Sequence, residues 1–137
     1  MAADGPLAHF AGHYTGSGRI TVNDGTSERI RCRSSNTATG SGLSLSMRCA
    51  SDSYKFDLGS ELTASGNEIS GSWNETTRGV TGSLSGKING GTIQATANAV
   101  GVTAGIAIRS AGNSLSVSIR SPGSEVSEVS VSMARGR

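Results

Sequence analysis

Aromatic residues, proline, histidine and charge are all scarce in this sequence. Of its 137 residues, 4% are aromatic, 16% are charged and two are proline. Disordered chains usually combine high net charge with weak apolar periodicity, whereas here the net charge is +2 and the periodicity is strong. No apolar run reaches the length of a membrane-spanning helix. The chain has the size of one domain, whose core must be built mainly from aliphatic side chains.

The residue types that carry most enzyme chemistry are also few. The two histidines, His9 and His13, lie on a predicted strand, where they would be about 13 Å apart, too far to share a metal. The two cysteines lack the paired spacing of zinc sites. No serine, histidine and carboxylate combination can be assigned a mechanism. Glu28 and Glu75 have the parity of the inward residues, but both sit beside turns, so we expect them to reach solvent at the barrel rim and not to form a buried acid–base pair. We therefore expect no catalytic residue, no metal and no cofactor, and a protein that is not an enzyme.

Apolar and polar residues alternate almost from end to end, which is typical of half-buried strands. No segment of comparable length keeps a helical period. The alternation predicts about ten strands, whose apolar positions fall within 10–22, 30–32, 43–49, 54–62, 69–73, 80–88, 93–97, 102–108, 115–119 and 129–133.

Turn residues separate these segments and predict hairpin registers, because directly opposite residues must share a face. Turns centred on 40–41, 51–52, 76–77, 90–91 and 111–112 all keep apolar residues on one side. They predict the opposite pairs Cys32–Cys49, Met47–Phe56, Trp73–Val80, Ile88–Ile93 and Ile106–Val117.

The predicted fold class is all-β: an antiparallel up-and-down meander that closes into a barrel of the calycin type. Closure removes the two unpaired edges of a sheet this wide; the alternative is a two-sheet sandwich. The apolar face is the inner one, so we expect a protein that does not span a membrane. Residues 9–135 should form this single domain, with residues 1–8 as a flexible N-terminus.

Cys32 and Cys49 are predicted to lie directly opposite each other on neighbouring strands, which is close enough for a disulfide. Two buried free thiols are the alternative. A disulfide indicates an oxidising compartment. Because Ala2-Ala3-Asp4 resembles the start of a mature exported protein, we expect a periplasmic or secreted location, with a signal peptide already removed.

A cluster of basic residues occupies the outward positions of the first four strands. The predicted registers place Arg33 opposite Arg48 and Arg48 opposite Lys55, and such like-charge pairs favour an anionic partner. A plain solvated face is the alternative reading, and the lack of aromatic residues there argues against nucleic acid. The candidate patch comprises Arg19, Arg31, Arg33, Arg48 and Lys55.

Many inward positions hold glycine or alanine, among them Gly16, Gly82 and Ala95. Such small residues either let the strands bend until the walls touch or leave a cavity. In the second case, the cavity would bind a ligand with the aromatic residues Tyr14, Tyr54, Phe56 and Trp73. The sequence leaves these two alternatives open.

Three stretches carry a family resemblance: residues 12–33, with Gly16-Ser17-Gly18-Arg19-Ile20; residues 47–57, with Met47-Arg48-Cys49-Ala50; and residues 71–78, with Gly71-Ser72-Trp73-Asn74. Together they resemble small exported β-rich proteins of alphaproteobacteria that have no assigned function. The resemblance implies a bacterial envelope or secreted location, and it supplies no active site.

Two functions fit these expectations. The first is a binding barrel, similar in fold to lipocalins, that holds a small apolar molecule inside; this is an analogy of fold alone. The second is a structural or interaction module of the bacterial envelope that contacts another envelope protein through its outer surface.

Overall fold

The computed structural model describes residues 7–123 and 126–136, which are all β apart from one 3-10 turn, η2 (Ala8–Phe10). The predicted strand count is confirmed. Along the described chain run β1 (Gly12–Val22), β2 (Ser27–Thr39), β3 (Gly42–Ala50), β4 (Lys55–Ser65), β5 (Glu68–Glu75), β6 (Val80–Asn89), β7 (Thr92–Ala99), β8 (Val102–Ala111), β9 (Ser114–Arg120) and β10 (Val126–Arg135). No helix formed by these residues is long and apolar enough to cross a membrane.

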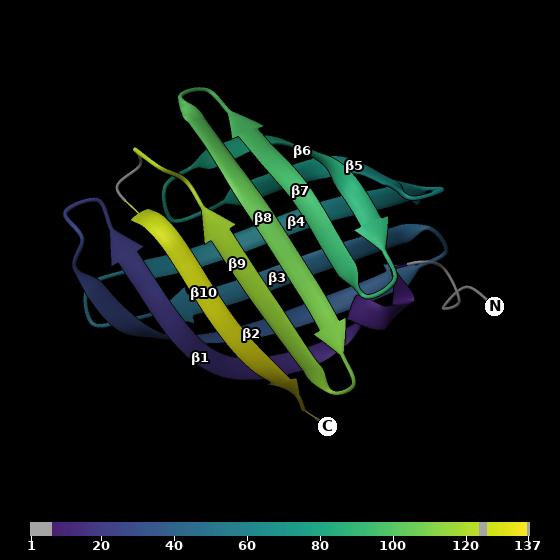
Figure 1. Cartoon of the computed structure of the whole chain (residues 1–137), viewed down its shortest axis with the longest axis horizontal. Helices are drawn as coiled ribbons and strands as arrows, with labels where there is room; N and C mark the ends of the chain where they lie inside the picture. Colours follow the sequence, from purple (N-terminus) through teal and green to yellow (C-terminus); the bar gives the residue numbers. More distant parts are fainter. Residues whose placement is uncertain (1–6, 124–125, 137) are drawn as a thin grey trace.

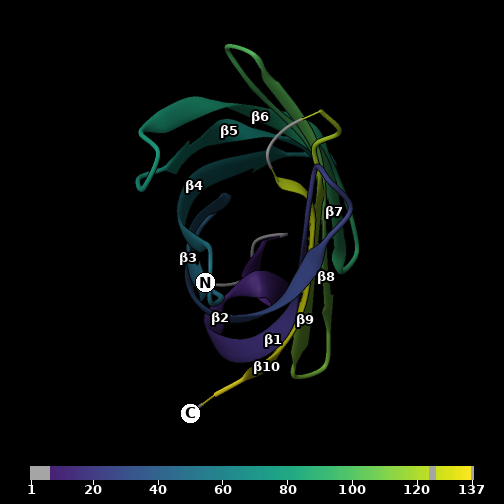
Figure 2. The ribbon, with the colours of Figure 1, turned by 90° about the vertical axis from the view of Figure 1, so that its left-hand side faces the viewer.

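The strands close into one antiparallel barrel. Each strand pairs with its neighbours in sequence, and β1 also pairs with β10, where Gly18 lies opposite Val131. The predicted closed barrel is therefore confirmed, and the two-sheet sandwich is wrong. In Figure 1, β7 to β10 run diagonally in front of β2 to β4. Figure 2 shows these two walls facing each other across the interior.

β1 curves beneath the interior and pairs with β2 on one side and β10 on the other. The glycines at the middle of β1 make this curve possible. A Cβ atom added to Gly16 would lie 2.0 Å from the Ser132 carbonyl oxygen, and one added to Gly18 would lie 1.8 Å from that of Ser130. Glycine is therefore required where β1 approaches β10 this closely.

The predicted registers are correct at two hairpins, where Cys32 pairs with Cys49 and Ile88 pairs with Ile93. They are wrong by two residues at three others. The observed pairs are Met47–Leu58, Trp73–Gly82 and Ile106–Ile119.

The errors arise from the lengths and centres of the connections. Residues 51–54 and 76–79 form four-residue connections, and the turn between β8 and β9 is centred one residue later than predicted, on 112–113. Gly112 there has a φ of +59°, a conformation that favours glycine. Because each error is an even number of residues, every side chain keeps its predicted face.

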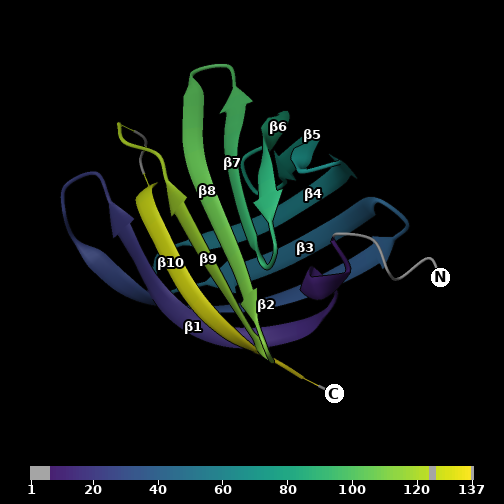
Figure 3. The ribbon, with the colours of Figure 1, turned by 45° about the vertical axis from the view of Figure 1, so that its right-hand side comes forward.

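η2 closes one end of the barrel. Leu7 and Phe10 are completely buried, and Figures 2 and 3 show η2 between the two walls. The Asn36 side-chain amide donates a hydrogen bond to the Phe10 carbonyl (2.9 Å), and the Ser110 hydroxyl donates one to the His9 carbonyl (2.8 Å). These bonds join the N-terminal segment to β2 and β8.

The N-terminal boundary differs from the prediction. Of the segment 1–8 that was expected to be flexible, residues 1–6 lie outside the described residues, whereas Leu7 is buried and Ala8 begins η2. The prediction that His9 lies on a strand is wrong, because it belongs to η2. Three residues are too few to show a helical period in the sequence.

Candidate ligand-binding cavity

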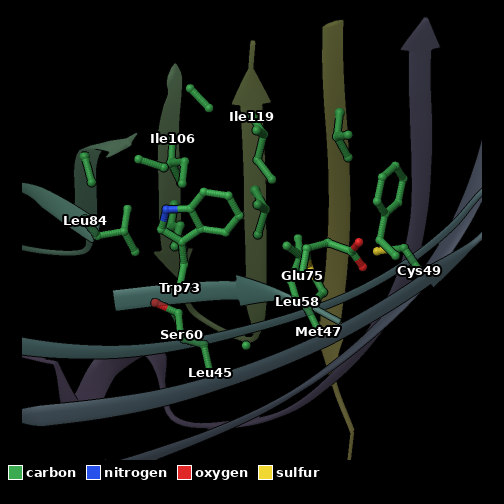
Figure 4. Close-up of a pocket in the computed structure, with 18 of the residues that line it drawn as sticks. Leu45, Met47, Cys49, Leu58, Ser60, Trp73, Glu75, Leu84, Ile106 and Ile119 are labelled. Carbon is green, nitrogen blue, oxygen red and sulfur yellow. The ribbon is translucent and has the colours of Figure 1, made fainter. Parts of the chain in front are cut away.

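The barrel interior contains a partly open cavity of about 370 Å³, within the range of roughly 300–1,000 Å³ that is usual for ligand pockets. Its walls are mostly apolar and come from every strand from β2 to β10. Figure 4 shows part of this lining, with Leu45 and Met47 below and Ile106 and Ile119 above. Ala95, one of the small inward residues, is among those that line it. Of the two alternatives that the sequence leaves open, the structure therefore shows the one in which small inward residues accompany a cavity.

Two of the four aromatic candidates line the cavity. Phe56 extends from β4 and Trp73 from β5. Tyr14 does not: its hydroxyl donates to the Ala11 carbonyl (3.1 Å) and accepts from Arg135 (2.8 Å), so it fastens the closed end. Tyr54 lies in the connection before β4 and is not part of the cavity lining.

Few polar groups reach the cavity. The Ser60 hydroxyl donates to the Ser72 carbonyl (3.0 Å), and the Ser34 hydroxyl donates to the Asn36 side chain. The Trp73 indole nitrogen is buried and has no hydrogen-bond partner among the described residues. In Figure 4 the Trp73 ring projects from β5 into the interior, with Leu84 and Ile106 around it.

Glu75 lies where β5 ends, at the cavity end opposite η2. The prediction that its side chain reaches solvent is wrong. Its position beside a turn indicated a side chain that reaches solvent, but Glu75 is only 5% exposed. Its carboxylate accepts hydrogen bonds from the backbone N–H groups of Asp57 (2.7 Å) and Arg78 (2.9 Å) and from the Thr77 hydroxyl (2.6 Å). This carboxylate therefore holds the β5–β6 connection against β4.

The same hydrogen bonds control the charge of Glu75. Burial acts to raise its pKa, but the bonds from Asp57, Thr77 and Arg78 outweigh burial, and the pKa lies below its ordinary value of 4.5. Arg78 forms an ion pair with this carboxylate at 3.3 Å and lies over the Phe56 ring, 4.9 Å from its centroid. The two ionisable groups that line the cavity are thus engaged with each other at its mouth.

We expect Glu75→Gln to lower the free energy of unfolding by about 1–3 kcal/mol near pH 7, because buried N–H groups then face a poorer acceptor. A lowered pKa in the folded state means that the carboxylate stabilises the fold fully above its ordinary pKa and loses this effect as the pH falls through the folded pKa. Urea unfolding over a series of pH values from about 7 to 3 measures both effects.

The difference between wild type and Glu75→Gln should shrink towards the acid end of that series. Glu61→Gln on the exposed face of β4 is the matched control and should change stability little. Parallel stability curves for wild type and Glu75→Gln would contradict the assignment of a stabilising charge to Glu75.

The basic patch is only partly assembled as predicted. Arg33 lies opposite Arg48 as expected, but Arg48 lies opposite Asp57, not Lys55, and its Nε is 3.6 Å from the Asp57 carboxylate. Arg31, Arg33, Arg48 and Lys55 border one surface depression. Arg19 is not part of it and donates to the Ser27 hydroxyl (3.3 Å).

Cys32 and Cys49 form a disulfide between β2 and β3, with their Cα atoms 4.1 Å apart, as predicted. Both residues are buried, and Cys49 also lines the cavity. Across the described part of the chain, no three histidine, cysteine or acidic side chains are grouped as a metal site would require.

No protein-family model matches the chain, and no curated protein matches it. Among solved structures, the chain is similar to Rv2717c from M. tuberculosis, with a TM-score of 0.73 and 14% sequence identity. The match covers 96% of this chain and 95% of that chain. At this level of identity the likeness extends to the fold alone, so the chain shares with Rv2717c a barrel fold over nearly its whole length.

Proposed function

We propose that this protein is a non-enzymatic binding protein that holds a small apolar molecule inside the barrel. The observation that carries the proposal is the cavity of about 370 Å³, which the protein's own aliphatic side chains leave unfilled. Protein interiors are normally close-packed, and unfilled apolar volume costs on the order of several kcal/mol in lost contacts. A ligand that occupies this volume would recover those contacts.

The chemistry of the lining supports binding over catalysis. Of the side chains that line the cavity, Glu75 and Arg78 are the ionisable ones, and they bond to each other. A general acid or base needs a pKa near the working pH, whereas the pKa of Glu75 is shifted down and away from neutrality. The lining offers apolar contact area and no assembled acid–base pair.

The outer surface supports the alternative function less well. Arg48 is paired with Asp57, so the patch has less unbalanced positive charge than its predicted registers implied. We therefore favour the interior as the functional part of the molecule.

We also propose that the protein works in the bacterial envelope or outside the cell. The disulfide supports this, because disulfides persist mainly in oxidising compartments. The resemblance of residues 12–33 and 47–57 to exported alphaproteobacterial proteins agrees with it.

Trp73 provides a direct test of binding, because it is the single tryptophan of the chain and lies in the cavity wall. We expect the neutral apolar dye N-phenyl-1-naphthylamine to bind at about one molecule per protein and to accept excitation energy from Trp73. Fluorescence titration measures this, and native mass spectrometry of the purified protein should detect a bound lipid-like molecule. A protein that leaves the dye in water and carries no extractable molecule would contradict the proposal.

A further inference from the structure

We propose that the outer face of β1, β2 and β3 docks onto an anionic lipid bilayer, with its arginine side chains bound to lipid phosphate groups. The inference goes beyond the proposed ligand binding and does not require it. It starts from the charges on this face, which the structure describes completely. The outward side chains of the three strands include no carboxylate and five arginines: Arg19, Arg29, Arg31, Arg33 and Arg48.

The strand registers bring these five arginines into one cluster. Arg19 on β1 lies directly opposite Arg29 on β2, and Arg33 on β2 lies directly opposite Arg48 on β3. Arg31 lies between the two pairs, and Figure 2 shows the three strands side by side in one stretch of wall. The predicted patch omits Arg29, so the face is more basic than expected. Like charges directly opposite each other on neighbouring strands destabilise a sheet.

Two carboxylates border the cluster, and both are already bonded. Asp57 on β4 forms an ion pair with Arg48, at 3.6 Å. Glu28 accepts hydrogen bonds from the Ser51 hydroxyl (2.7 Å) and the Ser53 N–H (3.2 Å). The other four arginines form no ion pair with any described residue. Most of the positive charge on this face is therefore not balanced within the described protein.

An outer strand face of this protein does not need such charge to be solvated. On β9 and β10 the outward opposite pairs include Ser116–Ser132 and Ser118–Ser130. The whole chain has a net charge of only +2, yet five cations gather on three of its ten strands. Two like-charge pairs, where uncharged hydroxyl pairs would suffice, indicate that the cluster contacts an anionic partner.

The chemistry of the face favours lipid phosphates over nucleic acid. The planar guanidinium group matches the oxygens of a phosphate with paired hydrogen bonds. Among the described residues, the outward side chains of β1, β2 and β3 include no phenylalanine, tyrosine or tryptophan, so a single-stranded nucleic acid would find no ring on which to stack a base.

The position of the cluster also favours a bilayer. Phe56 lines both the cavity and the surface depression that Arg31, Arg33 and Arg48 border. Arg78 at the cavity mouth donates a hydrogen bond to a backbone carbonyl at the edge of this depression, that of Lys55 (3.1 Å). A bilayer bound to the arginines would therefore lie beside the mouth of an apolar cavity, and it is itself a reservoir of apolar molecules.

The test is co-sedimentation with two kinds of vesicle, one of phosphatidylcholine alone and one of phosphatidylcholine and phosphatidylglycerol in equal parts. We expect binding to the anionic vesicles only, and weaker binding as the salt concentration rises, because this attraction falls off within a Debye length. Each basic residue near an anionic surface contributes about a fivefold factor to partitioning. Arg29→Gln combined with Arg33→Gln should therefore weaken binding about 30-fold.

This double variant should still fold, because it removes one member of each like-charge pair; urea unfolding checks this. The matched control is Lys87→Gln combined with Arg109→Gln, which removes two charges from exposed positions on β6 and β8. The control should bind anionic vesicles with an affinity close to that of wild type.

Equal binding to both kinds of vesicle, or an equal loss in the two double variants, would overturn the proposal. Absence of binding to the anionic vesicles would also overturn it, and binding to a single-stranded DNA oligonucleotide instead would assign the cluster to nucleic acid. Vesicle binding is measured without the dye. Its failure therefore leaves the cavity proposal standing, and a barrel that binds no dye leaves this proposal standing.

Discussion

Replacing Cys32 and Cys49 together by alanine should lower the free energy of unfolding by about 3 kcal/mol. The disulfide closes a loop with a sequence separation of 17 residues, and in the chain-entropy model a loop of this size restricts the unfolded chain by about that amount. Alanine is preferred to serine because both sites are buried and a hydroxyl there would need a partner. Urea unfolding of the variant and of wild type measures the change.

Reduction of the wild type with dithiothreitol is the control, and it should reproduce the loss seen in the double variant. A thiol assay under denaturing conditions should find no free thiol in protein from an oxidising host, and two after reduction. If reduction leaves the free energy of unfolding unchanged, the expected loss of about 3 kcal/mol is contradicted. The disulfide would then not reduce the conformational entropy of the unfolded chain.

Ala95→Phe should weaken dye binding by more than about a hundredfold. Ala95 lines the cavity from β7, and a benzyl group there would occupy volume that a ligand needs. If the ring displaces about four methylene groups of the ligand, at about 0.8 kcal/mol each, the loss is about 3 kcal/mol. Fluorescence titration with N-phenyl-1-naphthylamine measures it.

Thr96→Phe is the matched control, because it adds the same ring to the next residue of β7, on the exposed outer face. It should leave dye affinity close to that of wild type. Circular dichroism and urea unfolding should show that Ala95→Phe still folds, since overpacking typically costs about 1–3 kcal/mol. A folded Ala95→Phe with wild-type affinity would place the dye outside the barrel.

The hairpin registers show how far pattern reasoning reaches. Alternation has a period of two, so it identifies which residues share a face but cannot distinguish registers that differ by two. Met47 was predicted opposite Phe56 and lies opposite Leu58, on the same inner face. Cys32 was paired correctly with Cys49 because the predicted turn centre, 40–41, is also the observed one.

The candidate site was less predictable than the fold. Trp73 and Phe56 were identified because they are aromatic and inward, but Tyr14 satisfied the same criteria and instead anchors the closed end through Ala11 and Arg135. Glu75 shared inward parity with Trp73, a signal that could have placed it in the interior. Its position beside a turn, however, indicated an exposed side chain.

The sequence by itself determined the all-β class, the inner and outer faces of the strands and the partner of each cysteine. These properties depend on alternation and on turns between residues close along the chain, so local reasoning reaches them. The tertiary structure alone decided that the interior holds a cavity, that η2 closes one end, and that the Trp73 N–H is buried without a partner. These features depend on the distance between strands that face each other across the barrel, such as β5 and β8. The pattern of residues within one strand does not determine that distance.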